Sequence, residues 1–182
     1  MIIERTLLSN CYLIKFEPKF AARGYLSRTY CSEEFSKVGL NTNWPQRNVS
    51  YSKNTGTVRG LHFQVNPTPE IKIVRCTSGS IFDVVVDIDF SSKTFGTWAA
   101  FNLTEGDNQE LYIGAGLAHG FQTLESESEV EYSHSVNYVP GNAMGISAFD
   151  ARLAIPWPKS ITLVSENDLN LPTLEAYGSH QN

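Results

Sequence analysis

Two side chains able to do anion and proton chemistry lie three residues apart in residues 57–64. Arg59 carries a planar cation that can bind a phosphate through paired hydrogen bonds, and His62 carries an imidazole that can move a proton near neutral pH. In a regular extended strand, alternation would send these two side chains to opposite faces. A bend at Gly60 would bring both to one opening, where they could act together.

The other three histidines differ in their surroundings. His119 lies in a glycine-punctuated stretch over residues 114–121 at the expected start of a strand, where Gly120 leaves it free to point into a cavity. The alternative is a loop histidine whose ring is hydrogen-bonded to backbone. His134 lies on the apolar-leaning face of its strand, which favours a structural role. His180 lies in a polar tail and is expected to be solvated. His62 is followed by Phe63-Gln64 rather than by a second histidine, so we expect no metal site.

Three further residues could work with an imidazole. Asp83 interrupts an apolar run and, if it faces the interior, needs a partner such as a histidine. Tyr132 could pack in its strand or donate a proton inside a polar cavity. Asp168 could orient an imidazole as the third group of a catalytic triad does, although its local sequence indicates only a helix cap.

The elements that must position these residues are mostly short strands. Alternation is clearest over residues 81–90, where Phe82, Val84 and Val86 share one face and Ile81, Asp83 and Val85 the other. A short helix is expected over residues 33–37, capped by Ser32 and stopped by Gly39. The C-terminal part is expected to be irregular or weakly helical, with an irregular tail over about 173–182. Further strands are expected at 72–76, 98–103, 110–113, 121–124 and 129–136.

This pattern predicts an all-β protein, a jelly-roll β-sandwich or barrel with a few short helices and a pocket at its open end. The chain has 182 residues, 41% of them hydrophobic, and we expect one domain over residues 1–182. The net charge of −5 disfavours nucleic acid or an anionic membrane as partner. No signal peptide or membrane span is expected, and the unpaired spacing of Cys11, Cys31 and Cys76 predicts reduced thiols in a cytoplasmic protein.

Several short motifs in a fixed order resemble one family. The chain is similar, from about residue 23 to 174, to the dTDP-4-dehydrorhamnose 3,5-epimerases, cupin-like enzymes that epimerise nucleotide-linked 4-keto-6-deoxy sugars. The motifs that carry the resemblance are Arg23-Gly24, Gln46-Arg-Asn-Val-Ser-Tyr-Ser52, Arg59-Gly-Leu-His-Phe-Gln64, Lys72-Ile-Val, Phe82-Asp-Val-Val-Val-Asp87, Ser92-Lys-Thr-Phe-Gly-Thr-Trp98, Ala118-His-Gly-Phe121, Trp157-Pro158 and Ser165-Glu-Asn-Asp168.

The resemblance implies a role for each catalytic residue. His62 matches the general base, Asp168 its carboxylate partner, Tyr132 the acid on the opposite face of the sugar, and Lys72 the cation beside the 4-keto oxygen. The residue types suit this chemistry, because a 4-keto group acidifies the hydrogens on C3 and C5. Epimerisation then needs a base, an acid on the other face and a positive charge for the enolate between them.

The resemblance also implies a binding set, a homodimer and the absence of a metal or organic cofactor. The ligand expected for the protein is a nucleotide-diphosphate sugar. Arg23 of one subunit is expected to reach a nucleotide phosphate in the site of the other. The expected substrate-binding residues are Arg23, Arg28, Gln46, Asn48, Arg59, His119 and Asp83.

Some positions depart from the family pattern. Arg28 stands where an acidic residue is usual, Leu26 near an expected aromatic, Ala143 at an expected glutamate and Asn167 at an expected lysine. These departures favour the same chemistry on a somewhat different nucleotide or sugar. A dTDP-linked substrate is expected, and a CDP-linked 4-keto-dideoxysugar with epimerisation at C5 is the alternative, because Arg28 has only donors to offer a base.

Three other functions stay open at this point. A non-catalytic carbohydrate-binding jelly roll would not need His62, Lys72, Tyr132 and Asp168 together, and a metal-dependent cupin would need a metal. A mono-epimerase or ketoisomerase of the same superfamily is not separable by sequence, because the number of carbons that react depends on how the substrate lies.

Overall fold

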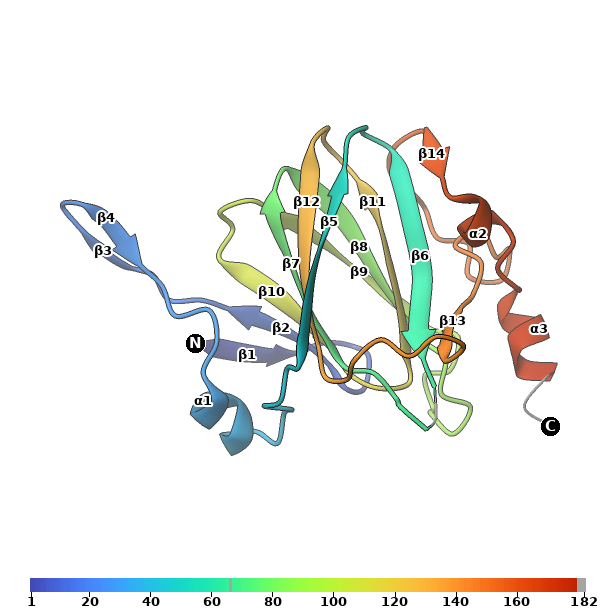
Figure 1. Cartoon of the computed structure of the whole chain (residues 1–182), viewed down its shortest axis with the longest axis horizontal. Helices are drawn as coiled ribbons and strands as arrows, with labels where there is room; N and C mark the ends of the chain where they lie inside the picture. The colour runs from blue at the N-terminus through green and yellow to red at the C-terminus, as the bar shows by residue number, and fades with distance from the viewer. Residues whose placement is uncertain (66, 180–182) are drawn as a thin grey trace.

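Two six-stranded β-sheets face each other in the computed structural model (Figure 1). The structure describes residues 1–65 and 67–179. The strands of the first sheet lie in the order β1 (Ile2–Arg5), β2 (Cys11–Lys15), β10 (Gln109–Ile113), β7 (Lys72–Ser78), β12 (Ser128–His134) and β5 (Gln46–Ser52). Those of the second lie in the order β13 (Ala143–Gly145), β6 (Thr57–Gln64), β11 (Leu117–Thr123), β8 (Ser80–Asp87) and β9 (Trp98–Thr104), and β14 (Leu163–Val164) pairs with β6.

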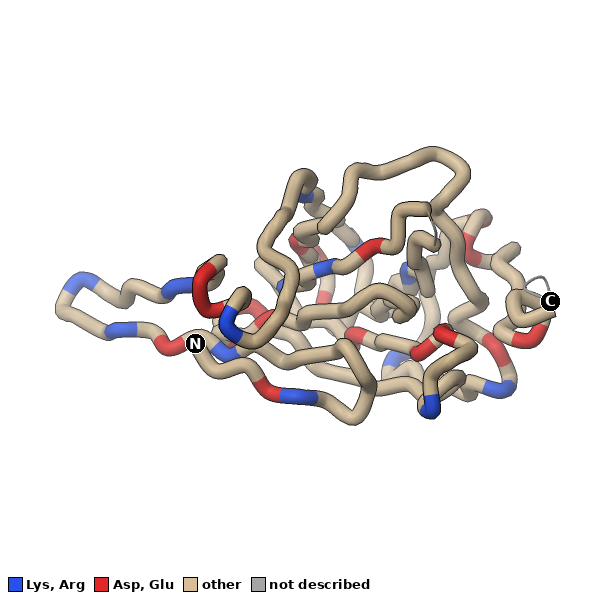
Figure 2. The backbone as a smooth tube through the Cα atoms, turned by 90° about the horizontal axis from the view of Figure 1, so that it is seen from below, with Lys and Arg blue, Asp and Glu red and all other residues tan. Residues whose placement is uncertain are grey.

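The predicted all-β, jelly-roll type of fold is confirmed, and it is a sandwich rather than a barrel because neither sheet closes on itself. A separate hairpin of β3 (Lys19–Ala21) and β4 (Gly24–Leu26) projects away from the sandwich (Figure 1). Basic and acidic residues are interspersed along the chain (Figure 2), and the projecting hairpin carries two basic residues, Lys19 and Arg23. Among the described residues, no helix combines the length and the apolar character that crossing a membrane requires.

The apolar core between the sheets fills one end of the sandwich and leaves the other end to polar side chains. Val74 and Cys76 of β7 and Val130 of β12 belong to this core. Because side chains two residues apart share a face, the same faces of these strands continue into Lys72 and Tyr132. A further core covers the outer face of the second sheet and includes Val84 and Val86, as the alternation over residues 81–90 predicts.

Two local predictions were wrong in detail. The strand predicted to reach residue 90 ends at Asp87, whose carboxylate accepts hydrogen bonds from the Asp89 N–H and the Thr94 hydroxyl and so turns the chain. Helix α1 (Ser32–Lys37) has Cys31 at its N-cap, so Ser32 is its first residue rather than its cap, while Gly39 follows its end with φ +76° as a helix stop requires.

The C-terminal part is weakly helical, which is one of the two alternatives predicted for it, but its tail is more regular than predicted. Helix α2 (Glu166–Leu169) and helix α3 (Leu174–Ser179) form there, and α3 occupies most of the tail that was predicted to be irregular. Burial of Leu174 and Tyr177 against the second sheet explains why so short a helix is stable. His180 lies outside the described residues, and the three cysteines are free, as predicted.

Candidate active site

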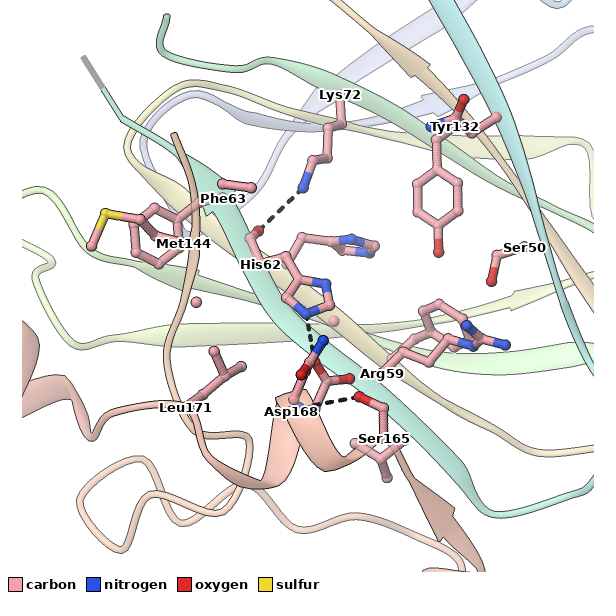
Figure 3. Close-up of a pocket in the computed structure, with 18 of the residues that line it drawn as sticks. Ser50, Arg59, His62, Phe63, Lys72, Tyr132, Met144, Ser165, Asp168 and Leu171 are labelled. Atoms are coloured by element: carbon pink, nitrogen blue, oxygen red, sulfur yellow. Dashed lines mark hydrogen bonds and ion pairs between the residues drawn. The ribbon is translucent and has the colours of Figure 1, made fainter. Parts of the chain in front are cut away.

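A cavity of about 780 Å³ opens between the two sheets at the end that the apolar core leaves free. This volume is in the range of pockets that hold small ligands. Both sheets contribute functional side chains to it (Figure 3): the second sheet supplies Arg59 and His62, and the first supplies Lys72 and Tyr132.

Arg59 and His62 both line the cavity although they are three residues apart on one strand. The register explains this, since His62 pairs with His119 and Arg59 with Phe121, so two residues of β6 stand opposite Gly120 alone. Such a bulge adds one residue to the strand and moves the next side chain to the other face. The bend expected at Gly60 is therefore present.

Two glycines make this bulge possible. Gly60 has φ +100°, and a Cβ atom there would lie 2.6 Å from the carbonyl oxygen of His119. A Cβ atom on Gly120 would lie 2.5 Å from the carbonyl oxygen of Arg59. The close approach of the two backbones therefore requires glycine on both strands.

Asp168 reaches the bulge from α2. Its Oδ1 atom lies 2.7 Å from Nε2 of His62, and its Oδ2 atom accepts the Gly60 N–H at 3.2 Å. The Ser165 hydroxyl caps α2 by accepting the Asp168 N–H and so fixes the start of the helix that carries the carboxylate. Burial acts to raise the pKa of Asp168, but the hydrogen bonds from His62 and Gly60 outweigh it and hold the pKa below its usual value.

This pairing selects the reactive atom of His62. Nε2 faces the carboxylate, so Nδ1 is the ring nitrogen left to take up a proton. The side chain of His62 is half exposed to the cavity, while that of Asp168 is buried. A buried carboxylate therefore orients an imidazole whose other nitrogen can reach a ligand, as in a catalytic triad.

Tyr132 stands on the opposite wall, in contact with a second imidazole–carboxylate pair. Its ring lies 5.9 Å from that of His119, whose Nε2 atom is 2.7 Å from Oδ2 of Asp83. Burial raises the pKa of Tyr132, and the Asp83 carboxylate acts in the same direction against the attraction of Arg59. The phenol therefore keeps its proton and is available as a donor. The predicted histidine partner of Asp83 is confirmed, and His119 lies inside β11 rather than at its start.

Lys72 completes the first-sheet wall. Its Nζ atom donates to the carbonyl oxygen of His62 at 3.1 Å (Figure 3), so the ammonium lies beside the strand that carries the base. The cavity thus joins an imidazole, a phenol and an ammonium from two sheets, which are the groups that proton transfer next to a carbonyl needs.

Four predicted substrate-binding residues do not line this cavity. Asp83 is fully buried behind His119, so its place is that of a partner to the imidazole rather than a ligand contact. Gln46 accepts the backbone N–H of Tyr138. Arg28 forms an ion pair with Glu34 at 2.9 Å, and Arg23 lies in the turn of the projecting hairpin. Asn48 does line the cavity, as predicted.

Two cavity residues were missed. His134 was predicted to be structural but lines the cavity, and Glu70, which was not considered, accepts a hydrogen bond from it at 2.7 Å. The alternation that puts Val130 and Tyr132 on one face also puts His134 there, so the signal was present in the sequence. Among the described residues, no group of three His, Cys, Asp or Glu side chains could hold a metal ion.

Fold and cavity together define the class of this protein as a jelly-roll protein whose cavity is equipped for proton transfer next to a carbonyl group. The family model of the dTDP-4-dehydrorhamnose 3,5-epimerases matches residues 5–176. The chain belongs to this family, and it is an isomerase of the group that epimerises carbohydrates.

Individual relatives are similar over most of their length. A dTDP-4-dehydrorhamnose 3,5-epimerase of Sinorhizobium fredii is 39% identical over 96% of this chain and 90% of its own. A dTDP-4-dehydrorhamnose 3-epimerase of Streptomyces niveus is 34% identical over 84% of this chain and 73% of its own. The crystal structure of the Bacillus anthracis 3,5-epimerase with TDP and pyrophosphate bound superimposes with a TM-score of 0.90 at 33% identity, covering 94% of this chain and 98% of that one.

Proposed function

We propose that the protein epimerises a dTDP-linked 4-keto-6-deoxyhexose at C3, C5 or both, in the biosynthesis of a deoxysugar. The observation that carries this proposal is the placement of His62 and Tyr132 on facing sheets, with the Lys72 ammonium 3.1 Å from the carbonyl oxygen of His62. A sugar ring in the cavity would present one face to the imidazole and the other to the phenol, which is what inversion at carbon requires.

The proposed reaction has two proton transfers. Nδ1 of His62 takes the proton from the carbon next to the 4-keto group, and the electron pair of that C–H bond moves into the enolate. Asp168 stabilises the imidazolium that forms. The Lys72 ammonium stabilises the negative charge on the enolate oxygen, and Tyr132 then protonates the same carbon from the other side. Arg59 favours the phenolate that is left.

The nucleotide is proposed to bind along the Arg59 side of the cavity. The guanidinium is oriented by hydrogen bonds to the Ser52 hydroxyl and the Tyr51 carbonyl, and it is exposed, so its remaining N–H groups can bind a diphosphate. Relatives named for dTDP-linked substrates support thymidine as the nucleoside. The alternative of a CDP-linked substrate depended on Arg28 facing the base, and in this chain Arg28 is paired with Glu34 instead.

The assembly is proposed to be a homodimer in which Arg23 reaches the partner's site. The hairpin that carries Arg23 stands apart from its own sandwich (Figure 1), and its apolar side chains Phe20 and Leu26 are each 77% exposed. Burial of such residues against a second copy would remove their apolar surface from water. A cytoplasmic location, supported by the free cysteines, and independence of metal are part of the same proposal.

Proton NMR in deuterated water, with dTDP- and CDP-linked 4-keto-6-deoxyhexoses, tests the activity. We expect deuterium at C3, C5 or both, with inversion, and a higher kcat/KM for the dTDP-linked sugar. Activity that survives removal of metals with a chelator supports metal independence. Absence of exchange with every sugar tried would overturn the proposed reaction, and a clear CDP preference would overturn the proposed nucleotide.

One-centre epimerisation is the second candidate function, favoured by the 34% identity to the 3-epimerase of Streptomyces niveus. The same experiment separates the two, because a mono-epimerase inverts a single carbon. The two functions share His62, Tyr132 and Lys72 and differ only in how the sugar ring lies between them.

A further inference from the structure

A third imidazole–carboxylate pair lies in the cavity beside Lys72. Glu70 accepts a hydrogen bond from Nδ1 of His134 through Oε1 at 2.7 Å, and its Oε2 atom lies 3.2 Å from Nζ of Lys72. All three side chains line the cavity and are nearly buried, with 7%, 11% and 10% of their surfaces exposed for Glu70, His134 and Lys72. The carboxylate therefore bridges an imidazole and the ammonium away from bulk water.

The backbone brings these groups together by strand pairing. His134 stands directly opposite Lys72 in the register of β12 against β7, and Glu70 precedes Lys72 by two residues. On the far side of the ring, Nε2 of His134 lies 3.3 Å from the amide nitrogen of Asn48. An amide N–H that donates to Nε2 leaves the ring proton on Nδ1, where it binds Glu70.

The carboxylate remains charged despite its burial. Burial acts to raise the pKa of Glu70, but the hydrogen bond from His134 and the charge of Lys72 outweigh it and lower the pKa to about 2. Glu70 is thus an anion throughout the pH range in which an enzyme works. A buried ammonium next to such an anion is stabilised in its charged form.

Lys72 is held from two sides by this arrangement. Its ammonium has three donors, of which one meets the carbonyl oxygen of His62 and one meets Glu70. One donor remains for a ligand in the cavity. A free lysine side chain samples many rotamers, so two fixed acceptors direct the remaining N–H.

We propose that Glu70 and His134 are positioning residues for the reaction, with Glu70 holding Lys72 charged and in place and His134 orienting Glu70. This inference rests on the proposed function, which puts Lys72 beside the oxygen that becomes negative in the enolate. Charge stabilisation of this kind depends on donors that are already oriented when the charge develops.

Glu70→Gln tests the inference, with Glu131→Gln as the matched control. Glu131 lies on β12 next to Tyr132, outside the cavity, and its ion pair with Arg47 is 3.6 Å long. We expect Glu70→Gln to lower kcat by up to about 100-fold while KM changes little, since misplacing a reacting group by 1 Å can have an effect of this size. Glu131→Gln is expected to match the wild type.

The pH profile gives a readout that a purely structural role would not move. Without its counter-ion a buried ammonium is less stable in its charged form, so the alkaline limb of the kcat profile should move to lower pH in Glu70→Gln. The other titratable groups that line the cavity, all unchanged in this variant, are Arg59 and His62 on β6, His119 on β11, Tyr132 and His134 on β12, Tyr138 after β12, and Asp168 on α2. A profile and kcat equal to those of the wild type would overturn the inference.

Two His134 variants keep the test available if Glu70→Gln does not fold. His134→Phe removes the donor to Glu70 and should lower kcat, and His134→Gln keeps an N–H donor and should recover a large part of it. Equal kcat in the two would contradict the proposed role of His134.

Crystal structures of the substrate-free wild type and Glu70→Gln separate this inference from the proposed function. In the variant, Nζ of Lys72 should leave its place beside the carbonyl oxygen of His62. Such a displacement in a protein without epimerase activity would overturn only the proposed reaction. Epimerase activity with Lys72 in an unchanged position would overturn only the positioning role of Glu70.

Discussion

Oδ1 of Asp168 lies 2.7 Å from Nε2 of His62, although 106 residues separate them in the chain. The other oxygen of the same carboxylate accepts the N–H of Gly60, the residue at which β6 bulges. One side chain therefore holds both the imidazole and the backbone that turns the imidazole into the cavity. The pairing joins the motif over residues 59–64 to helix α2, so one carboxylate positions both the base and the bulge.

Replacement of His62 by Ala should abolish both epimerisation and exchange of the substrate's protons with solvent. Loss of a general base lowers the rate by about two to four orders of magnitude. The side chain is half exposed, so stability measured by urea unfolding should change little. Near-normal turnover of His62→Ala in the NMR exchange assay would remove this residue from the mechanism.

Asp168→Asn should lower kcat strongly while leaving the cavity lined by the same groups, because an amide does not stabilise the imidazolium as a carboxylate does. The pKa of Asp168 is lowered in the fold, so its ionised form stabilises the native state above the pKa of an unfolded aspartate, which is about 3.9.

Unfolding of wild type and Asp168→Asn at a series of pH values measures this stabilisation. The wild type should be the more stable above about pH 5, and its advantage should shrink as the pH falls through the lowered pKa. A difference in the free energy of unfolding that stays unchanged down to about pH 2 would contradict the assignment of an ionised Asp168.

Tyr132→Phe should separate the two proton transfers. His62 can still take a proton from the substrate, but the opposite face has lost its donor, so deuterium should enter with retention faster than the carbon inverts. The NMR assay reports both rates in one sample. Equal losses of exchange and inversion would mean that Tyr132 is not the sole acid on that face.

Glu110→Gln should stabilise the protein at pH 8. Burial raises the pKa of Glu110 to about 8, with Arg75 acting against it, and its Oε1 atom has no hydrogen-bond partner among the described residues. A carboxyl whose folded pKa is raised binds a proton that the unfolded chain has lost. Stability therefore falls as pH rises from about 4.5 to 8, by an amount on the order of a few kcal/mol.

Urea unfolding at fixed protein concentration measures this difference, with exposed Glu175→Gln as the control. The free energy of unfolding of Glu110→Gln should exceed that of the wild type by an amount that grows between pH 5 and about pH 8. Near pH 4, where both side chains are neutral, the two free energies should be equal. A gain that does not depend on pH would point to packing rather than to the buried carboxyl.

Sedimentation at micromolar concentration should give the mass of a dimer. In that dimer Arg23→Ala should weaken binding of the nucleotide, because the substrate phosphate loses the contact with the guanidinium. Loss of one such contact is expected to raise KM more than it lowers kcat. Arg152→Ala is a suitable control because that guanidinium is exposed and lies outside the cavity. A fully active monomer would contradict the proposed role of Arg23.

Local patterns in the sequence were enough for the β class and for most strands. Alternation placed Val84 and Val86 on one face and Asp83 on the other, and it is readable because side chains two residues apart always share a face. Strand ends were less predictable. Asp87 ends β8 through hydrogen bonds to residues that follow it, which alternation does not register.

By itself the sequence determined which residue types were available for acid–base chemistry, because His62, Lys72 and Asp168 stand in recognisable motifs and Tyr132 stands in a strand with clear alternation. Only the tertiary structure decided which of them meet. The bulge opposite Gly120 turned Arg59 and His62 to one side, and strand pairing brought His134 to Lys72 and Glu70. Contacts of this kind join strands far apart in the chain and depend on register, which short-range patterns do not specify.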